Sequence, residues 1–234
     1  GDETQRQEIP DYVRELGVTS FKFHSYKAKF YPYDTIGLTE ISDGDMYLGF
    51  KKIAEVEGAM AMVHCENQDI AEKLRAIAIA KGEEDLVAYC DTRPNFIEAM
   101  DVEKAVMLAR ATSAPLHIVH MTAGESTDIV ARAKREGIKI TAETCPHWLL
   151  LNKFSVRHLG PLCVETPAFK DKESNEKLWY GINNGIVECM CTDHASNIKA
   201  NKTSIWTAKG AWGQLETYLP VMLSEGVNKS RISL

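Results

Sequence analysis

The chain has 234 residues, of which 44% are hydrophobic and 26% charged, and its formal net charge is −6 at pH 7. The negative charge argues against a nucleic-acid surface, which needs clustered Lys and Arg, and the ordinary apolar content argues against global disorder. No apolar run reaches the roughly 20 residues of a membrane-spanning helix. The length suits one large domain or two small ones.

In chain order, the hydrophobic pattern predicts a strand at 18–24, a helix at 45–58, a strand at 59–64, helices at 69–82 and 94–112, a strand at 115–122, a helix at 125–137, a strand at 138–145, a helix at 174–185, a strand at 186–193 and a last helix at 215–226. Five of these helices end on glycines, which favour the C-cap, and 94–112 opens with a proline, which suits a first helical turn. Apolar strands separated by helices indicate parallel βαβ units covered on both faces.

The five predicted strands leave two architectures open. A closed (β/α)8 barrel takes about 250 residues and eight strands, so five strands leave a barrel incomplete. Either the sheet is open and doubly wound, or the chain forms part of a TIM-type barrel. No Pro/Gly/Ser-rich linker divides the sequence, and no short-period repeat is visible.

The cysteines indicate free thiols. Six cysteines stand at positions 65, 90, 145, 163, 189 and 191, and none forms the CxxC pair typical of a zinc knuckle. Several lie inside apolar runs, where Cys behaves as a small hydrophobic residue. The N-terminal stretch GDETQRQEIP lacks the layout of a signal peptide. We therefore expect reduced cysteines and a cytoplasmic location.

Polar side chains close the predicted strands. The first strand carries Lys22 and His24, the second ends on His64, the third on His120, the fourth on Glu143, Cys145 and His147, and the fifth on Asp193 and His194. In parallel α/β folds the C-terminal ends of the strands form the functional face, and His and carboxylate ligands suit Zn²⁺ or a similar ion. A single histidine closing a strand is more often a hydrogen-bonded structural residue, so spacing alone leaves both interpretations open.

Six segments together identify a resemblance. The stretches GVTSFKFHSYK, VHCEN, RPNFIEA, PLHIVHMT, AETCPHWLLL and CTDHA follow one another in the order typical of the cyclic amidohydrolases. The chain most resembles the hydantoinase and dihydropyrimidinase branch, with allantoinase and dihydroorotase as relatives, over roughly residues 10–226. The resemblance implies a (β/α)8 barrel that holds two divalent metal ions, usually zinc, bridged by a carboxylated lysine.

The resemblance also implies roles for four strand-end residues. Lys22 resembles the lysine that adds CO₂ and becomes a bridging carbamate, which requires a neutral amine. His64 and His120 resemble the ligands of one metal ion. Asp193 resembles a ligand of the other ion and the base for the attacking water.

Two further positions have weaker counterparts in the family, and a third is a candidate because of its position beside Asp193. Tyr26 resembles the tyrosine that polarises the scissile carbonyl, although family members usually have one more residue between it and the lysine. Thr166 stands where the family has a serine before proline, and we expect it to contact substrate. His194, beside the aspartate, is a second substrate-contact candidate, while His147 is interpreted as structural.

One departure from the family pattern concerns the set of metal ligands. The family's His-x-His metal pair, on its first strand, has no counterpart in these 234 residues. The resemblance thus indicates a partial barrel over 1–234, covering about strands four to eight, without the earlier strands or the family's β-sandwich domain. We expect at most one weakly held metal ion and no activity from this piece alone. Exposed strand edges would favour a homo-oligomer.

The resemblance predicts a hydrolase that opens a small cyclic amide, of hydantoin or dihydropyrimidine type, with a metal-activated water. Allantoinase or dihydroorotase activity is an alternative. A non-catalytic assembly protein built on the same barrel is another, but such relatives typically lose metal ligands that this sequence retains. A flavodoxin-like binding domain is disfavoured because no Gly-rich phosphate loop is present.

Overall fold

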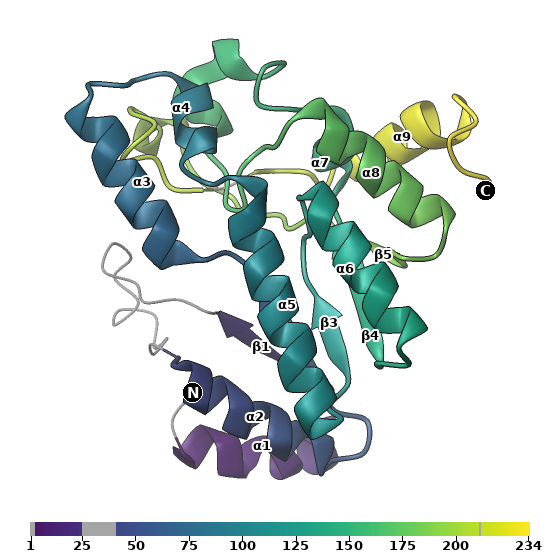
Figure 1. The fold of residues 1–234 in the computed structure, drawn as a ribbon. Coiled ribbons are helices and arrows are strands. Elements are labelled where there is room, and N and C mark those ends of the chain that lie inside the picture. The colour runs from purple at the N-terminus through teal and green to yellow at the C-terminus, as the bar shows by residue number, and fades with distance from the viewer. Residues whose placement is uncertain (1–2, 25–40, 211) are drawn as a thin grey trace.

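The computed structural model describes residues 3–24, 41–210 and 212–234 as one α/β unit (Figure 1). The strands are β1 Ser20–His24, β2 Met60–His64, β3 Leu116–Ile118, β4 Ile140–Thr144 and β5 Cys189–Met190. The helices are α1 Glu3–Leu16, α2 Asp43–Ala54, α3 Gln68–Ala80, α4 Leu86–Asp91, α5 Asn95–Thr112, α6 Gly124–Arg135, α7 Pro146–Leu150, α8 Lys172–Asn183 and α9 Tyr218–Val221. Short 3₁₀ helices span Arg157–Cys163 and Lys199–Asn201, and a π-helix spans Met222–Val227.

The five strands form one parallel sheet in the order β1-β2-β3-β4-β5. A doubly wound sheet reverses its strand order at a switch point, whereas each strand here pairs with the next one along the chain. This sequential order is that of a barrel wall, so it decides between the doubly wound sheet and the partial barrel. The predicted incomplete TIM-type barrel is confirmed, and the open doubly wound sheet is not observed.

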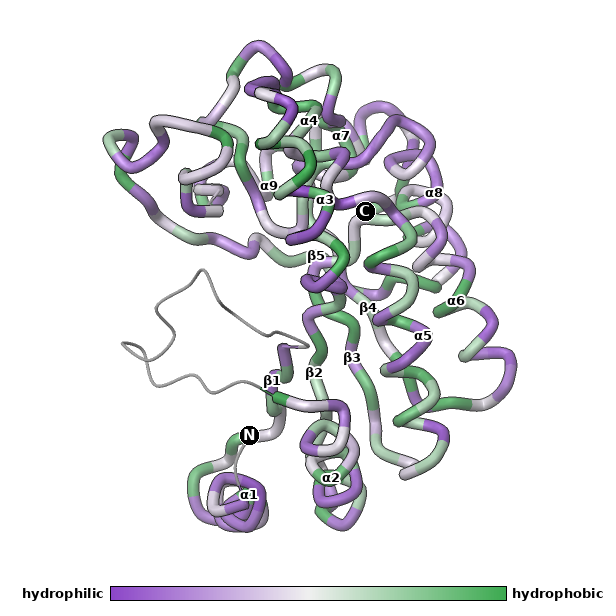
Figure 2. Tube along the Cα trace, turned by 60° about the vertical axis from the view of Figure 1, so that its left-hand side comes forward, coloured by the Kyte–Doolittle hydropathy of each residue, from purple (hydrophilic) through white to green (hydrophobic). Residues whose placement is uncertain are grey.

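Burial alternates along the strands. Ala61 and Val63 of β2 are buried, whereas Met60 and Met62 are half-buried, and β4 alternates in the same way. The face with the buried residues packs against the helices, and Figure 2 shows α5 and α6 lying on one side of the strands. On β2 and β4 the second face, which points to the inside of the barrel wall, is thus only half-buried, whereas all three residues of β3 are buried, as the sequence-based expectation had it.

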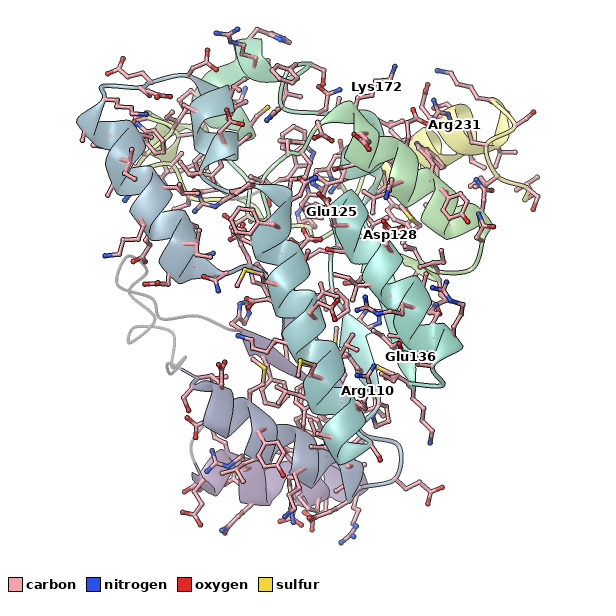
Figure 3. All side chains as sticks on the ribbon, viewed as in Figure 1. Arg110, Glu125, Asp128, Glu136, Lys172 and Arg231 are labelled. Atoms are coloured by element: carbon pink, nitrogen blue, oxygen red, sulfur yellow. The ribbon has the colours of Figure 1, made fainter. Side chains whose placement is uncertain are left out.

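Ion pairs join the solvent sides of neighbouring helices. Arg110 near the end of α5 pairs with Glu136 just after α6, and both lie at the lower ends of these helices in Figure 3. Lys177 of α8 pairs with Asp128 of α6. Such exposed pairs contribute little to stability, so the packing of the apolar helix faces is the main support of the sheet.

The element boundaries differ from the predicted ones at both ends. Helix α1 was not predicted, because it is mostly polar and Ile9 is its one buried residue. The predicted strand 186–193 shortens to Cys189–Met190, and the predicted helix 215–226 becomes α9 followed by the π-helix. No helix within the described parts of the chain is long and apolar enough to cross a membrane.

Candidate active site

Two histidines from adjacent strands face each other at the C-terminal edge of the sheet. His64 is the last residue of β2, and His120 follows β3 in the turn toward α6. The His64 Nδ1 and His120 Nε2 atoms are 2.9 Å apart, and both side chains are buried. His24 of β1 is opposite His64 in the parallel register, and the two rings stack with centroids 5.0 Å apart. Three imidazoles from three successive strands thus form one group.

All three imidazoles are neutral at neutral pH. Burial, with smaller effects of Lys22 and Arg93, lowers the pKa of His64 to about 3. Burial, His64 and Lys22 lower the pKa of His24 to about 3, and the same three causes hold the pKa of His120 well below its ordinary value. Because the neutral imidazole is the form that binds a metal ion, the group is in the ligand-competent state.

Lys22 and Asp193 stand on the first and last strand segments of the same sheet edge. The positive charge of Lys22 lowers the pKa values of His64, His120 and Asp193, so all three lie within its electrostatic reach. Burial raises the pKa of Asp193, while Lys22 lowers it and Glu143 raises it. Four predicted site residues therefore lie toward the same ends of the strands. The described parts of the chain leave one of them, Lys22, exposed.

Two of these residues have strained backbones. His120 has a φ of 38° and Asp193 a φ of 41°, in the left-handed region that residues other than glycine rarely adopt. Such strain persists where surrounding contacts fix the chain, and it concentrates at functional sites. The strain therefore distinguishes His120 and Asp193 from ordinary strand-end residues.

A buried glutamate that the sequence analysis did not single out holds the turn after His120. Glu98 of α5 accepts hydrogen bonds from the backbone N–H groups of Thr122 (3.1 Å) and Ala123 (2.9 Å) and from Ser126 Oγ (2.7 Å). These donors belong to the start of α6, where backbone N–H groups need partners. The available signal was the RPNFIEA segment, in which a glutamate stands between apolar residues.

Thr166 belongs to a separate polar group. Its Oγ1 lies 3.3 Å from the hydroxyl of Tyr89, and that hydroxyl donates to the carbonyl oxygen of Glu165 at 2.8 Å. Gly210 packs closely on this loop, since a Cβ at position 210 would lie 3.1 Å from the Thr166 backbone nitrogen. The loop that contains Thr166 is thus held from two sides.

Two predicted site residues remain, His194 and Tyr26. His194 is exposed, and its Nδ1 accepts the backbone N–H of Gln214 at 3.0 Å, so one ring nitrogen is already used to hold the 212–215 loop. Its Nε2 edge is the part left to contact a substrate. Tyr26 lies outside the described residues.

Glu165 is a second buried carboxyl group that sequence analysis missed. It is 3% exposed, and burial, together with the Asp193 carboxylate, raises its pKa to about 8. At neutral pH this carboxyl group is mostly protonated and is a hydrogen-bond donor. The one sequence signal was a glutamate inside the apolar stretch LCVETPAF.

The donor set fits a divalent metal ion in part. Among residues 3–24, 41–210 and 212–234, no group of three or more His, Cys, Asp or Glu side chains is arranged to hold an ion. A carbamate on Lys22 would add an oxygen ligand to the two imidazole nitrogens. His120 Nδ1 is buried without a hydrogen-bond partner in the described parts of the chain. Two neutral imidazoles with converging nitrogens suit zinc.

Curated relatives match most of the chain. It is 34% identical over 197 residues to an allantoinase of Bacillus licheniformis, covering 83% of this chain and 43% of the relative. It is 31% identical over 196 residues to an allantoinase of Enterococcus faecalis, with the same shares covered. No protein-family model matches the sequence. The chain thus spans less than half the length of these relatives.

Solved structures share the fold over the whole chain. The L-hydantoinase (dihydropyrimidinase) of Arthrobacter aurescens superposes with a TM-score of 0.90 at 27% identity, covering 100% of this chain and 51% of that one. The dihydropyrimidinase of Brevibacillus agri also has a TM-score of 0.90, at 25% identity, covering 100% of this chain and 50% of that one. The described sheet and helices therefore correspond to about half of each of these structures.

Proposed function

The chain belongs to the cyclic amidohydrolase superfamily, and from this premise we propose that it forms part of a metal-dependent hydrolase that opens a small cyclic amide of hydantoin or dihydropyrimidine type. The observation that supports the proposal most is the His64–His120 pair, with its two nitrogens 2.9 Å apart at the ends of adjacent strands. His64 and Asp193 both lie within the electrostatic reach of Lys22. Catalysis at the C-terminal ends of strands is the rule for barrel enzymes.

The proposed roles follow from the chemistry of each group. His64 would bind a divalent ion through Nδ1 and His120 through Nε2, because these are the atoms that converge. Lys22 would add CO₂ at Nζ and release a proton, which gives an anionic oxygen ligand. A bound ion would make a water nucleophilic near neutral pH and polarise the scissile carbonyl.

The remaining residues would move the proton and hold the substrate. Asp193 would accept a proton from the attacking water and pass it to the leaving nitrogen, and the raised pKa of its carboxyl group favours such a shuttle. Tyr26 would hydrogen-bond the scissile carbonyl. Thr166 and His194 would contact the polar edge of the ring. Zinc is the ion that the imidazole ligands favour.

Allantoin is a second candidate substrate, because the curated relatives that match the chain are allantoinases. Dihydroorotate is a third, from the wider family. A non-catalytic assembly role is disfavoured by the retention of Lys22, His64, His120 and Asp193 together. All six cysteines are free thiols in the structure, which supports a reducing cytoplasm as the location, and a homo-oligomer remains the proposed assembly.

The test is metal analysis followed by ring-opening assays with hydantoin, dihydrouracil, allantoin and dihydroorotate. The assays should use the longest form of the protein that its gene encodes, loaded with zinc. We expect turnover with one of the four rings and loss of turnover on chelation. If this form binds zinc but opens none of the rings, the hydrolase proposal fails and the assembly alternative gains support.

A further inference from the structure

The contact between His64 and His120 requires one proton donor. With 2.9 Å between His64 Nδ1 and His120 Nε2, one nitrogen must carry a hydrogen and the other a lone pair. Both rings are buried, and because burial favours the neutral imidazole, each carries a single ring proton. Two arrangements satisfy the contact: either His64 donates from Nδ1, or His120 donates from Nε2.

A buried carboxylate faces the opposite edge of the His64 ring. Glu66 Oε2 lies 4.0 Å from His64 Nε2, and Glu66 is 1% exposed. If His64 carried its proton on Nδ1, the lone pair of Nε2 would point at this carboxylate and be repelled by it. A proton on Nε2 is attracted instead, and at this depth little solvent screens the difference.

Other buried side chains fix the Glu66 carboxylate in place. Gln68 Nε2 donates a hydrogen bond to Glu66 Oε2, and Arg93 Nε lies 3.5 Å from Glu66 Oε1. The Arg93 guanidinium packs over the ring of Tyr89 at 4.5 Å, and Lys170 Nζ donates to the Arg93 carbonyl at 2.6 Å. A buried carboxylate needs such partners, so the contacts with Gln68 and Arg93 hold Glu66 in one position behind His64.

We propose that Glu66 is a positioning residue that keeps the proton of His64 on Nε2 and so turns the Nδ1 lone pair toward His120. The metal part of this inference rests on the proposed function, in which the same lone pair binds the ion. Carboxylates that orient a metal-binding histidine through its other nitrogen are a general feature of such sites. Gln68 holds the Glu66 carboxylate in this arrangement, whereas Arg93 contacts Glu66 and also acts directly on His64, whose pKa it lowers.

The proposal has a consequence for His120. Without metal, His120 Nε2 must be the donor in the pair, so its Nδ1 carries the lone pair, and that atom is buried without a hydrogen-bond partner in the described parts of the chain. To bind an ion through Nε2, His120 must move its proton to Nδ1. Zinc should therefore change the tautomer of His120 and leave that of His64 unchanged.

The test is nuclear magnetic resonance of the full chain with ¹⁵N-labelled imidazoles, in which long-range proton–nitrogen correlations report the tautomer of each histidine. His64→Ala and His120→Ala spectra assign the two signals. We expect His64 to be protonated on Nε2 with and without zinc, and His120 to change from Nε2–H to Nδ1–H as zinc is added. A metal-free wild-type protein with His64 protonated on Nδ1 would overturn the inference.

Glu66→Gln tests the carboxylate itself. The neutral amide should allow a mixture of His64 tautomers and weaken zinc affinity by roughly 10–100-fold. Glu103→Gln is the control, since it removes a carboxylate from the exposed ion pair with Arg132. It should leave the His64 tautomer and the zinc affinity unchanged. An unaltered His64 signal and zinc affinity in folded Glu66→Gln would contradict the positioning role.

The two proposals fail differently. If Glu66→Gln does not fold, the wild-type tautomer decides the inference without a variant. If His64 has the expected tautomer but the protein binds no zinc, the proposed function and the metal part of the inference are both wrong. If zinc binds while His64 is protonated on Nδ1 beforehand, the inference fails and the proposed function stands.

Discussion

The backbone N–H of Thr122 donates to the carboxylate of Glu98, which reaches the turn after β3 from helix α5. The same carboxylate accepts from Ala123 and Ser126. Because this turn begins at His120, whose backbone is strained, the bonds to Glu98 hold the turn in the conformation that places His120 beside His64.

Glu98→Ala should therefore destabilise the protein and weaken zinc binding together. It leaves buried N–H groups unsatisfied, at about 1–3 kcal/mol for each group, and lets the turn relax away from the His120 geometry. Chemical unfolding and zinc titration measure the two effects. Glu103→Ala on the same helix removes only a largely exposed ion pair with Arg132 and should change stability by no more than about 0.5 kcal/mol. Equal effects of both variants would contradict a specific role of Glu98.

Lys22→Ala should abolish most ring-opening activity in the longest form of the protein. It removes the carbamate ligand, so the loss should exceed the roughly 10–100-fold typical of an outer partner of a metal ligand. Lys22→Arg should not restore activity, because a guanidinium stays protonated and forms no carbamate. Added short carboxylic acids should partly restore the alanine variant by supplying the missing oxygen ligand. Wild-type turnover in Lys22→Ala would exclude the bridging role.

His147→Phe should reduce the acid sensitivity of the fold. His147 stacks on Trp212 with ring centroids 5.5 Å apart, and burial, opposed by Gln214, lowers its pKa to about 3. The unfolded chain, with a histidine pKa of about 6.5, binds this proton more readily, so the contribution of His147 to stability is complete above about pH 6.5 and is lost as the pH falls toward 3.

Urea unfolding at pH 7, 5 and 4 measures this effect. His147→Phe should show a smaller fall in the free energy of unfolding between pH 7 and 4 than the wild type, because a phenyl ring has no proton to take up. Some slope should remain, since His24 and His64 have similarly lowered pKa values. His158→Gln, at an exposed position, should keep the wild-type slope. A wild-type slope in His147→Phe would show that another group dominates.

The sequence predicted the parts of the site that a strand positions. His64 and His120 close apolar runs, and parallel pairing places such ends at one edge of the sheet without further information. The family resemblance, confirmed by the comparisons, added the roles of Lys22 and Asp193, which stay predictions. The alternation of strands and helices predicted parallel βαβ units but left a doubly wound sheet and a partial barrel open, and only the family resemblance favoured the barrel.

The supporting residues could not be predicted, because they act across elements. Glu98 comes from a helix and meets a turn 24 residues away in the chain, and Glu165 is buried by the packing of a loop against the strand ends. Glu66 is two residues from His64, yet its role depends on the position of Arg93. No periodic pattern records such contacts, and the conformation of the 188–195 region likewise depends on packing rather than on β-propensity.

Residues 1–234 on their own should bind little metal. Two ions need two sets of ligands, and the family's His-x-His pair is not in this sequence. His64 and His120 can hold one ion, with Lys22 as a third ligand only if its exposed amine is carboxylated. Asp193 would be nearly alone on the second. We therefore expect at most one weakly bound zinc ion per chain, by calorimetric titration, and no detectable opening of hydantoin or allantoin.

Two control variants and a measurement of size show where any bound zinc is held. His64→Ala should abolish the weak zinc binding, whereas His158→Ala should leave it unchanged, because His158 lies on the exposed 3₁₀ helix Arg157–Cys163. Size-exclusion chromatography should be run on the same samples, because association through the unpaired edge of β1 could supply ligands from a second copy. Two tightly bound zinc ions per monomeric chain, or turnover like that of a complete family member, would show that these residues need no further ligands.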